Sequence, residues 1–427
     1  MPTLKTLTLG CKVNQYETEY VRQGLSRLGY REPRPGEAAD LCVVNTCTVT
    51  AEADRKSRKL IRQLARENPG ASIIVMGCYA TRRPDEAAAL PGVAEVVTDK
   101  NRLPELLARF GLDPIPTGIT SFGRRQRAYV KIQDGCRMEC AYCIIPRTRP
   151  VLRSRPIDEV VGEIRGLIDG GYQEIVLTGI HLGHYGVDLA GHDRTDAQTN
   201  LARLLRHLVR LDGDFRIRIS SIEACEVTDA VLDVIAEHPK RVCPHLHVSM
   251  QSGSDTVLQR MRRRWSSERF LERCRTIKRR LDHPGLTTDV IVGFPGETEA
   301  EFEATCRLVE NVGFSKIHGF RFSARPGTAA ARMTDVVPSH VQHRRLAKLA
   351  QIETRLRTSY FSSLLGRELC VLVESAAANR PGMLLGTSAR YVPVELPGQP
   401  HQVGRLVRVT AQSLGDNRVL AEAIHGA

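Results

Sequence analysis

The sequence predicts an α/β protein with three parts: a doubly wound parallel sheet, a partial (β/α)6 barrel of the TIM kind and a small all-β barrel. Two successive series of short apolar runs alternate with helical patterns, which is typical of parallel sheets. Residues 104–123, with Pro114, Pro116 and Gly118, separate the two series. Residues 368–424 instead show β-branched alternation interrupted by glycine and proline. A chain of 427 residues is long enough for about three such domains.

The first series predicts the doubly wound sheet. We expect strands at residues 4–9, 41–45 and 72–77, because each is a short apolar run. Between them, residues 17–28 and 51–67 have helical spacing with charged faces. This alternation places helices on the faces of a mostly parallel sheet.

The second series predicts the barrel. Six more strands are expected, at residues 128–133, 174–179, 216–221, 245–250, 288–293 and 316–322. Helical stretches separate them, such as residues 158–168, which Pro156 opens. Six βα repeats suit an incomplete parallel barrel. A basic amphipathic helix then runs from Pro338 to about Leu365. We place the three domains at residues 1–113, 122–352 and 364–427.

The composition favours a polyanionic partner. Lys and Arg total 61 against 48 Asp and Glu, a formal net charge of +13. Such an excess favours nucleic acid first and acidic membrane surfaces second. The alternative is a basic enzyme with no polyanion, since a charge excess alone does not locate a binding surface.

The chain is expected to be cytoplasmic, with its cysteines reduced. Residues 1–10 lack the charged and apolar regions of a signal peptide, and no run of about 18 apolar residues occurs. Cytosolic thiols are kept reduced, so the 12 cysteines favour metal binding or catalysis over disulfides wherever they cluster.

Three cysteines form the spacing C-x3-C-x2-C just after the first barrel strand: Cys136, Cys140 and Cys143. Three thiolates this close together can hold three irons of a cubane cluster and leave the fourth iron open. The carboxyl end of a barrel strand is also where barrels keep active sites. A zinc knuckle is the alternative, but no fourth Cys or His follows at a suitable spacing.

A second trio is separated in sequence but equivalent in position. Cys11, Cys47 and Cys78 each follow the carboxyl end of one strand of the first sheet. Those ends share one edge, so three thiolates from neighbouring strands can converge on one cofactor. Gly10 and Gly77 leave room for a close backbone approach. Three buried structural cysteines are the alternative.

These motifs resemble known families. The C-x3-C-x2-C string, with Tyr142 before its last cysteine, resembles the radical S-adenosylmethionine (SAM) signature. The strings "TLGCKVNQYE", "VVNTCTVT", "VMGCYA", "CRMECAYCIIPRTR", "LHVSMQSGS", "DVIVGFPGET" and "FSARPGTAA" resemble the methylthiotransferase family of radical SAM enzymes across essentially the whole chain. The carboxyl-terminal module resembles a TRAM domain.

The resemblance implies two 4Fe-4S clusters and SAM as cofactors. Cys11, Cys47 and Cys78 take the place of the ligands of an auxiliary cluster, and Cys136, Cys140 and Cys143 that of the ligands of the radical SAM cluster. The resemblance also implies that SAM chelates the open iron and that Tyr142 lies near its adenine. The partners implied are a tRNA substrate, an electron donor and a sulfur source of unknown identity, with no membrane.

Within the family, "GCKVNQYET" and "NTCTVTAEADRKSR" most resemble the branch that acts on N6-threonylcarbamoyladenosine in tRNA. The expected function is therefore conversion of this nucleoside, next to the anticodon, into its 2-methylthio derivative. The alternatives are methylthiolation of isopentenyladenosine or of a ribosomal-protein aspartate, and a non-catalytic iron-sulfur RNA-binding protein. Cys225 and Trp265 depart from the residues usual in relatives at their positions.

Other residues at strand ends are candidates for cofactor binding. They are Thr178, Gly179, Glu223, Ser249 and Gln251, whose alternative role is a hydrated polar rim. His181, His184 and His192 suggest a metal, but their spacing fits no common site, which favours ordinary surface histidines.

Basic residues near the second trio and in the β module are candidates for RNA contact. They are Arg147, Arg149 and Arg153, together with Arg390 and Tyr391 in the module. Charge runs are usually solvated faces, and Arg390 and Tyr391 also fit an ordinary strand.

Overall fold

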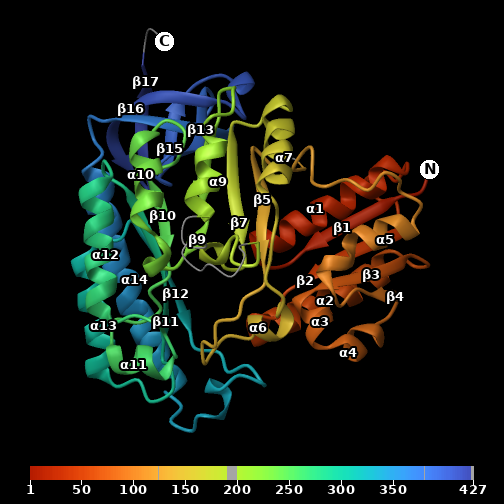
Figure 1. Ribbon diagram of the computed structural model, residues 1–427, viewed down its shortest axis with the longest axis horizontal. Coiled ribbons are helices and arrows are strands. Elements are labelled where there is room, and N and C mark those ends of the chain that lie inside the picture. Colours follow the sequence, from red (N-terminus) through yellow and green to blue (C-terminus); the bar gives the residue numbers. More distant parts are fainter. Residues whose placement is uncertain (124, 190–199, 379, 425–427) are drawn as a thin grey trace.

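Three β units form the molecule, and the middle one contacts both others (Figure 1). The computed structural model describes residues 1–123, 125–189, 200–378 and 380–424. The amino-terminal sheet, red to orange, lies beside the central barrel, and the carboxyl-terminal barrel, blue, covers one end of it (Figure 1). The expected architecture is confirmed: parallel sheets with helices form the first two units, and an all-β barrel forms the third.

The amino-terminal sheet is parallel throughout. Its order is β1-β2-β3-β4, formed by Leu4–Thr8, Leu41–Thr46, Ser72–Gly77 and Val93–Val96. Its helices are α1 (Lys12–Arg27), α2 (Ala51–Glu67), α3 (Cys78–Arg82), α4 (Pro84–Ala88) and α5 (Leu103–Arg109). Side chains alternate between faces along a strand. Val43 therefore packs in the core that includes α1 and α5, and Val44 packs in the core that includes α2, α3 and α4.

Helix α1 begins five residues earlier than the sequence predicts. Its first turns contain Asn14 and Glu17, polar side chains that are buried. Periodicity of apolar residues does not detect a helix whose buried face is polar. These side chains are satisfied instead by partners from other elements.

The central unit is a six-stranded parallel barrel with an open side. Its strands are β5 (Arg127–Asp134), β7 (Glu174–Gly179), β8 (Arg216–Ile219), β10 (His245–Val248), β11 (Gly285–Val292) and β12 (Lys316–Arg321). Short strands β6 (Arg153–Ser154) and β9 (Ser221–Ile222) complete two sheets, β6-β5-β7-β8 and β9-β10-β11-β12. A parallel bridge between Ile217 and Val242 connects them. All six predicted barrel strands are present.

Helices surround this barrel. They are α6 (Ile145–Thr148), α7 (Ile157–Asp169), α9 (Asn200–Leu208), α10 (Asp229–Glu237), α11 (Asp255–Arg260), α12 (Ser267–Arg280), α13 (Glu299–Val312) and α14 (Ser339–Ser362). Helix α13 starts with a capping box between Thr298 and Glu301. The sharp turn before it uses Gly293 and Gly296, both with positive φ.

The carboxyl-terminal module is a closed five-stranded barrel. Its strands are β13 (Glu368–Ala376), β14 (Met383–Ser388), β15 (Pro393–Pro397), β16 (Leu406–Gly415) and β17 (Arg418–Ala423), in the order 13-14-15-17-16. Helix α14 connects it to the central barrel, and Phe361 and Leu364 at that end belong to the module's core. The expected small all-β barrel is confirmed.

The module seals the amino-terminal end of the central barrel. Arg216 donates to the carbonyls of Cys370 and Thr387 at 2.7 and 2.8 Å. Arg218 donates to the carbonyls of Ser388 and Ala389 at 3.1 and 2.9 Å. The two guanidiniums also pair with Glu174, which is fully buried. The interface between barrel and module is therefore held by buried charge.

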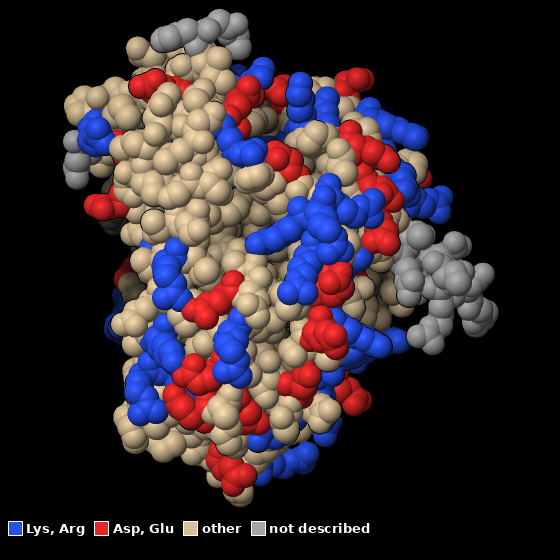
Figure 2. Space-filling model, turned by 90° about the vertical axis from the view of Figure 1, so that its left-hand side faces the viewer, with Lys and Arg blue, Asp and Glu red and all other residues tan. Residues whose placement is uncertain are grey.

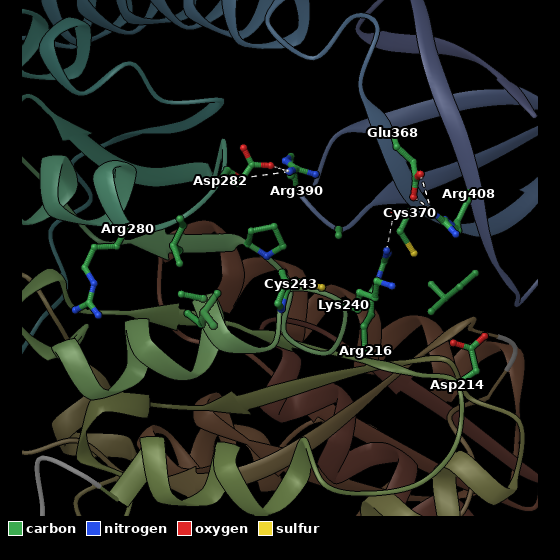
Figure 3. A pocket seen from close by; sticks show the side chains of 17 residues that line it. Asp214, Arg216, Lys240, Cys243, Arg280, Asp282, Glu368, Cys370, Arg390 and Arg408 are labelled. Carbon is green, nitrogen blue, oxygen red and sulfur yellow. Dashed lines mark hydrogen bonds and ion pairs between the residues drawn. The ribbon is translucent and has the colours of Figure 1, made fainter. Parts of the chain in front are cut away.

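A cavity of about 530 Å³ lies beside this interface (Figure 3). Most of its charged side chains are paired, as in Arg390 with Asp282 and Arg408 with Glu368. Its cysteines, Cys243 and Cys370, belong to neither trio. The cavity therefore lies away from the two cysteine trios that are the candidate cofactor ligands.

Basic and acidic side chains are interspersed on the face that Figure 2 shows. Ion pairs such as Lys348–Glu303 and Arg355–Glu310 connect α14 to α13 on the same side of the molecule. The positive excess is thus not concentrated there. No helix among the described residues is both long and apolar enough to cross a bilayer.

Candidate functional site

The first cysteine trio lies at the carboxyl edge of the amino-terminal sheet. Cys11 precedes α1, Cys47 follows β2 and Cys78 begins α3. Gly10 has φ of +101°, and a Cβ there would lie 3.1 Å from Sγ of Cys47. Gly77 has φ of +95°, and a Cβ would lie 2.4 Å from the carbonyl oxygen of Thr46. Only glycine lets these strand ends approach so closely.

Polar groups fix the loops around this trio. The Asn14 amide donates to the carbonyls of Leu9 and Thr46 at 2.9 and 3.0 Å, connecting two of the cysteine-bearing loops. Burial raises the pKa of Cys47 to about 11. Such a thiol gives up its proton when it binds a metal, because the metal takes the place of the proton on the sulfur.

The second trio lies in the loop after β5, at the carboxyl edge of the barrel. The Cys136 amide donates to the Arg149 carbonyl at 3.0 Å, and the Cys143 amide to the Cys140 carbonyl at 3.0 Å. Gly135 has φ of +80°, and a Cβ there would lie 1.9 Å from the Val151 carbonyl oxygen. Burial raises the pKa of Cys143 to about 12.

Arg263 holds several candidate side chains together. Its guanidinium donates to Sγ of Cys140 and to the Tyr142 hydroxyl, both at 3.3 Å. It also pairs with Glu223 at 2.5 Å. Its carbon Cζ lies 4.0 Å from the Trp265 ring centroid, in a cation–π contact. One buried cation thus positions a thiol, a phenol and a carboxylate around the second trio.

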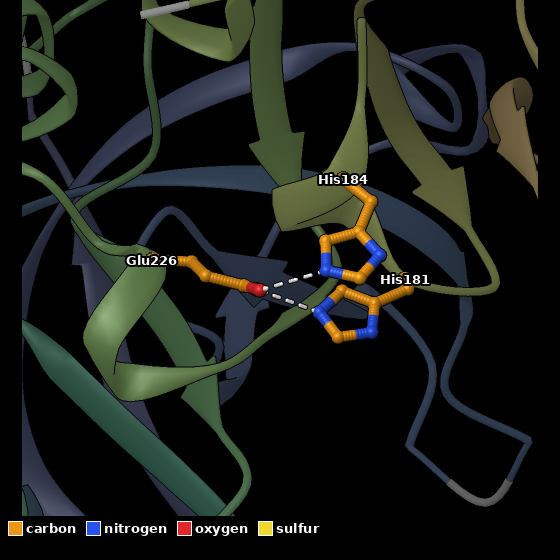
Figure 4. A group of neighbouring side chains, drawn as sticks. All are labelled: His181, His184 and Glu226. Atoms are coloured by element: carbon orange, nitrogen blue, oxygen red, sulfur yellow. Dashed lines mark hydrogen bonds and ion pairs between the residues drawn. The ribbon is translucent and has the colours of Figure 1, made fainter. Parts of the chain in front are cut away.

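His181 connects the second trio to a carboxylate (Figure 4). Its Nδ1 lies 3.5 Å from Sγ of Cys136, and its Nε2 lies 2.6 Å from Oε1 of Glu226. His184 stacks on it with ring centroids 3.8 Å apart. Gly183 is required for this approach, because a Cβ there would lie 1.8 Å from Oε2 of Glu226.

The prediction of ordinary surface histidines is wrong for His181 and His184. His181 is buried, and the side chain of His184 is 16% exposed. Burial lowers the pKa of His181, but hydrogen bonds to Cys136 and Glu226 raise it to about 10. Burial and the His181 charge lower the pKa of His184 to about 4. Glu226 thus supplies a partner for Nε2 of His181. His192 lies outside the described residues.

The predicted cofactor-binding residues line the same carboxyl edge. Thr178 and Gly179 end β7, and Glu223 follows β9. Ser249 and Gln251 follow β10; Gln251 has φ of +68° and its amide donates to the Asp289 carbonyl at 2.8 Å. The structure brings these residues to the rim that carries the second trio.

Arg149 is not at the surface, so the prediction that it contacts RNA is wrong. It is buried between the two domains, where it pairs with Glu17 and Asp134 at 2.7 Å. Lys131 pairs with the same carboxylates at 2.9 and 2.8 Å. Burial would raise the pKa of Glu17, but Arg149 and Lys131 more than offset this, and its pKa is lowered. Arg149 is therefore structural.

The other candidates for RNA contact divide into two groups. Arg147 and Arg153 are exposed, and neither forms an ion pair with a described residue. Arg390 donates to the His283 carbonyl and pairs with Asp282 of the barrel. Tyr391 stacks on His245 with centroids 4.6 Å apart. Arg390 and Tyr391 connect the module to the barrel, so the structure does not support RNA contact for them.

Two family models match the chain. The radical SAM superfamily model matches residues 130–309, which contain the second trio. The model of the uncharacterized protein family UPF0004 matches residues 3–99, which contain the first trio.

Curated relatives match nearly the full chain. The threonylcarbamoyladenosine tRNA methylthiotransferase MtaB of Bacillus subtilis is 40% identical over 97% of this chain and 95% of its own. The protein of the same name from Thermotoga maritima is 37% identical over 99% and 97%. The chain belongs to the methylthiotransferase family of radical SAM enzymes. A tRNA-2-methylthio-N(6)-dimethylallyladenosine synthase of Corynebacterium urealyticum is 33% identical over 96% of this methylthiotransferase and 80% of its own chain.

Solved structures share the fold of this methylthiotransferase at low identity. The radical SAM methyltransferase TsrM from Kitasatospora setae, solved with cobalamin and a [4Fe-4S] cluster, has a TM-score of 0.55 and 15% identity, covering 77% of each chain. The cobalamin-dependent radical enzyme OxsB has a TM-score of 0.53 and 11% identity, covering 83% of this chain and 56% of its own. These likenesses concern the fold alone.

The methylthiotransferase uses SAM and 4Fe-4S clusters, and both trios fit such a cofactor. Each trio offers three thiols on loops whose glycines leave no space for a Cβ. Buried cations lie near both: Arg263 contacts Cys140, and the charge of Arg149 opposes the rise in pKa that burial gives Cys11. A cluster ligated by thiolates is anionic, so these cations favour its binding.

Sequence reasoning missed Arg263, Glu226, Glu17 and Asp134. Arg263 lies in a run of basic residues, where only its burial separates it from solvated neighbours. Glu17 and Glu226 reach partners far away in sequence, and no local pattern indicates such partners. For His181, the H-x-x-H string was a signal, but spacing alone favoured the wrong interpretation.

Proposed function

We propose that this methylthiotransferase converts N6-threonylcarbamoyladenosine, next to the anticodon of tRNA, into its 2-methylthio derivative. The observation that carries the proposal is that Arg149 connects the two trios. Its carbonyl accepts from the amide of Cys136, while its guanidinium donates to the side chain of Asn14, in the first turn after Cys11, at 3.0 Å. Two cofactor sites joined through one residue suit a reaction that needs both on one substrate.

The trios are proposed to have separate roles. Cys11, Cys47 and Cys78 hold the auxiliary 4Fe-4S cluster, and Cys136, Cys140 and Cys143 hold the radical SAM cluster. When bound, the second cluster and SAM supply the radical that removes hydrogen from carbon 2 of adenine, the first cluster supplies sulfur, and SAM supplies the methyl group. The protein's own part is to place the thiols and to bind SAM and adenosine in one water-poor space.

The SAM-binding residues are assigned by their position around the second trio. Tyr142 contacts the adenine of SAM, while Thr178, Gly179, Glu223, Ser249 and Gln251 offer backbone and side-chain polar groups to its ribose and methionine. Arg263 positions Tyr142 and Glu223. A group held by a buried guanidinium loses little freedom on ligand binding.

The remaining assignments follow from the fold. We assign the domains to residues 1–113, 122–352 and 364–427, and the protein to the cytoplasm, where its tRNA is. Arg147 and Arg153, exposed near the second trio, supply phosphate contacts. An electron donor and a sulfur source complete the reaction.

A competition assay tests this function. Reduced, reconstituted enzyme is given SAM, sulfide and equal amounts of tRNA carrying threonylcarbamoyladenosine or isopentenyladenosine, and nucleosides are analysed by mass spectrometry. We expect the 2-methylthio derivative of the first nucleoside to dominate. A site built for a polar group rejects an apolar analogue strongly. Preference for the isopentenyl tRNA would contradict the proposed substrate.

Two triple variants serve as controls for the cluster assignment. Cys136, Cys140 and Cys143→Ala should abolish SAM cleavage and leave about four of about eight irons. Cys11, Cys47 and Cys78→Ala should also leave about four irons and allow SAM cleavage, but yield no methylthio product. Full iron retention in either variant would show that the ligands are misassigned.

A further inference from the structure

The barrel encloses a cavity below the carboxyl edge that carries the second trio. Its volume is about 250 Å³, below the about 300–1,000 Å³ of pockets for drug-sized ligands, so it suits a substituent rather than a whole nucleotide. His245 and His247 of β10 line it. Side chains alternate along a strand, so Ser249, two residues beyond His247, continues the same face up to the rim.

The arginines in the floor of the cavity are ion-paired, mainly with a carboxylate of the barrel itself. Arg127 and Arg218 line it, but they pair with Glu174, and Arg127 pairs with Glu374 as well. The Tyr391 ring closes the cavity from below by stacking on His245. Both guanidiniums therefore have carboxylate partners within the protein, although Nε of Arg127 is buried without a hydrogen-bond partner among the described residues.

Lys12 brings an additional charge into this cavity from the amino-terminal domain. It follows Cys11 directly, is half-buried and lines the cavity with His318 of β12. Its ammonium forms no ion pair with any described residue. Burial lowers the pKa of His318, and the charge of Lys12 contributes to that shift. A cation thus reaches the barrel interior from the loop of the first trio.

Polar atoms without partners accompany Lys12. Nδ1 of His245 and Nε2 of His247 are buried without a hydrogen-bond partner among the described residues. Asp289 lies 3.3 Å from Nε2 of His247, an ion-pair distance without hydrogen-bond geometry. Buried polar atoms in native proteins are generally satisfied, so these atoms favour a polar ligand.

We propose that this cavity binds the threonylcarbamoyl substituent of the substrate adenosine, with Lys12 pairing with its carboxylate. His247 and Asp289 form hydrogen bonds with the hydroxyl and N–H groups of this substituent. The inference rests on the proposed function and deepens it, because it says which residue selects the substrate. Arg149 does not serve this carboxylate, since it is buried in a structural ion pair.

The test pairs a change in the protein with a change in the ligand. Anticodon stem-loops carry either threonylcarbamoyladenosine or the analogue whose carboxylate is a carboxamide. Their binding to reconstituted, unreduced enzyme is measured by fluorescence anisotropy, and kcat/KM is measured after reduction. Wild type should prefer the carboxylate by about 10- to 100-fold, the range of a charge-assisted hydrogen bond.

Lys12→Gln should bind both stem-loops alike, at the affinity that wild type has for the carboxamide. Lys12→Arg, which keeps the charge, should retain most of the preference. Lys240→Gln, at an exposed lysine lining the cavity in Figure 3, should behave as wild type. Iron content and SAM cleavage should be unchanged in Lys12→Gln.

Two outcomes would overturn the proposal. Undiminished preference for the carboxylate in Lys12→Gln would place the carboxylate elsewhere. Equal weakening of both ligands, with loss of iron, would show that Lys12 serves the auxiliary cluster. Failure of the proposed function is distinguishable, because wild type itself would then not methylthiolate the threonylcarbamoyl stem-loop.

Discussion

A single hydrogen bond connects His181 to a proposed cluster ligand. Nδ1 lies 3.5 Å from Sγ of Cys136, while Glu226 and the stacked His184 fix the ring from the other side. The His181 amide also donates to Gln133 Oε1 at 2.8 Å, and Gln133 donates to the Gly135 carbonyl beside Cys136. The imidazole and the thiol are thus held by one network, so their distance is set by the fold.

Replacing His181 should change the potential of one cluster only. Hydrogen bonds to a ligating sulfur tune the reduction potential of an iron-sulfur cluster, and an N–H donor withdraws charge from the thiolate. His181→Ala should therefore lower the midpoint potential of the radical SAM cluster and leave that of the auxiliary cluster unchanged. Redox titration followed by electron paramagnetic resonance separates the two.

Two further variants control this measurement. His181→Gln keeps an N–H donor and should restore part of the potential. His340→Ala changes an exposed histidine on α14 and should have no effect. If the midpoint potential of the radical SAM cluster were unchanged in His181→Ala while the iron content stayed intact, His181 would have a packing role only.

At the scale of elements, α1 and β5 meet through a buried charge network as well as through the apolar core that they share. Glu17 of α1 and Asp134 of β5 share Arg149 and Lys131, and the side chains of Glu17 and Arg149 are each 1% exposed. The network contains two anions and two cations, so its net charge is zero. Such an arrangement is fixed in register, because removal of one member leaves an uncompensated buried charge.

Arg149→Met should destabilise the protein by about 3–5 kcal/mol, because Glu17 and Asp134 would remain buried with one cation instead of two. Arg153→Met, at an exposed neighbour, should change stability little. Calorimetric thermal unfolding under anaerobic conditions measures both. A melting temperature equal to wild type in Arg149→Met would show that water reaches the site.

The same network predicts a pH dependence. The pKa of Glu17 and that of Asp134 are both lowered, because Arg149 and Lys131 outweigh burial. A carboxylate with a lowered pKa stabilises the fold above its ordinary pKa, and this contribution is lost as pH falls through the lower value. The difference in free energy of unfolding between wild type and Arg149→Met should therefore become smaller as the pH falls.

Elements with local signals were predictable, and contacts between distant elements were not. Every predicted strand is present, because each is a short apolar run, and α2 matches its predicted bounds. The six cysteines could be proposed as ligands because their spacing or strand-end position is local. The start of α1, the burial of Arg149 and the role of Arg263 depend on partners more than a hundred residues away, such as Arg149 with Glu17 and Arg263 with Cys140. No pattern along the chain specifies such pairs.

At the scale of the whole molecule, the β module closes the barrel as well as extending it. Arg216 and Arg218 are buried against module carbonyls, and Tyr391 lies under the barrel cavity. Removing the module would expose these arginines and open the cavity from below. Its contribution to RNA binding is therefore best tested by single surface changes.

The exposed cations near the second trio should carry the salt dependence of tRNA binding. Each Lys or Arg contact with a phosphate releases condensed counterions, so the slope of log Kd against log salt falls in magnitude by about one when a contact is lost. Arg147→Gln and Arg153→Gln should each show this loss, because both residues are exposed and unpaired with any described residue. Arg405→Gln tests the module in the same way, since Arg405 is exposed there without an ion pair to the described residues.

Arg390→Gln is the control. It should leave the slope unchanged and lower the stability of the protein, because Arg390 pairs with Asp282 and donates to the His283 carbonyl. Filter binding of tRNA across a salt series gives the slopes. If Arg390→Gln lowered the slope and Arg147→Gln and Arg153→Gln did not, the tRNA would lie over the interface between module and barrel, away from the second trio.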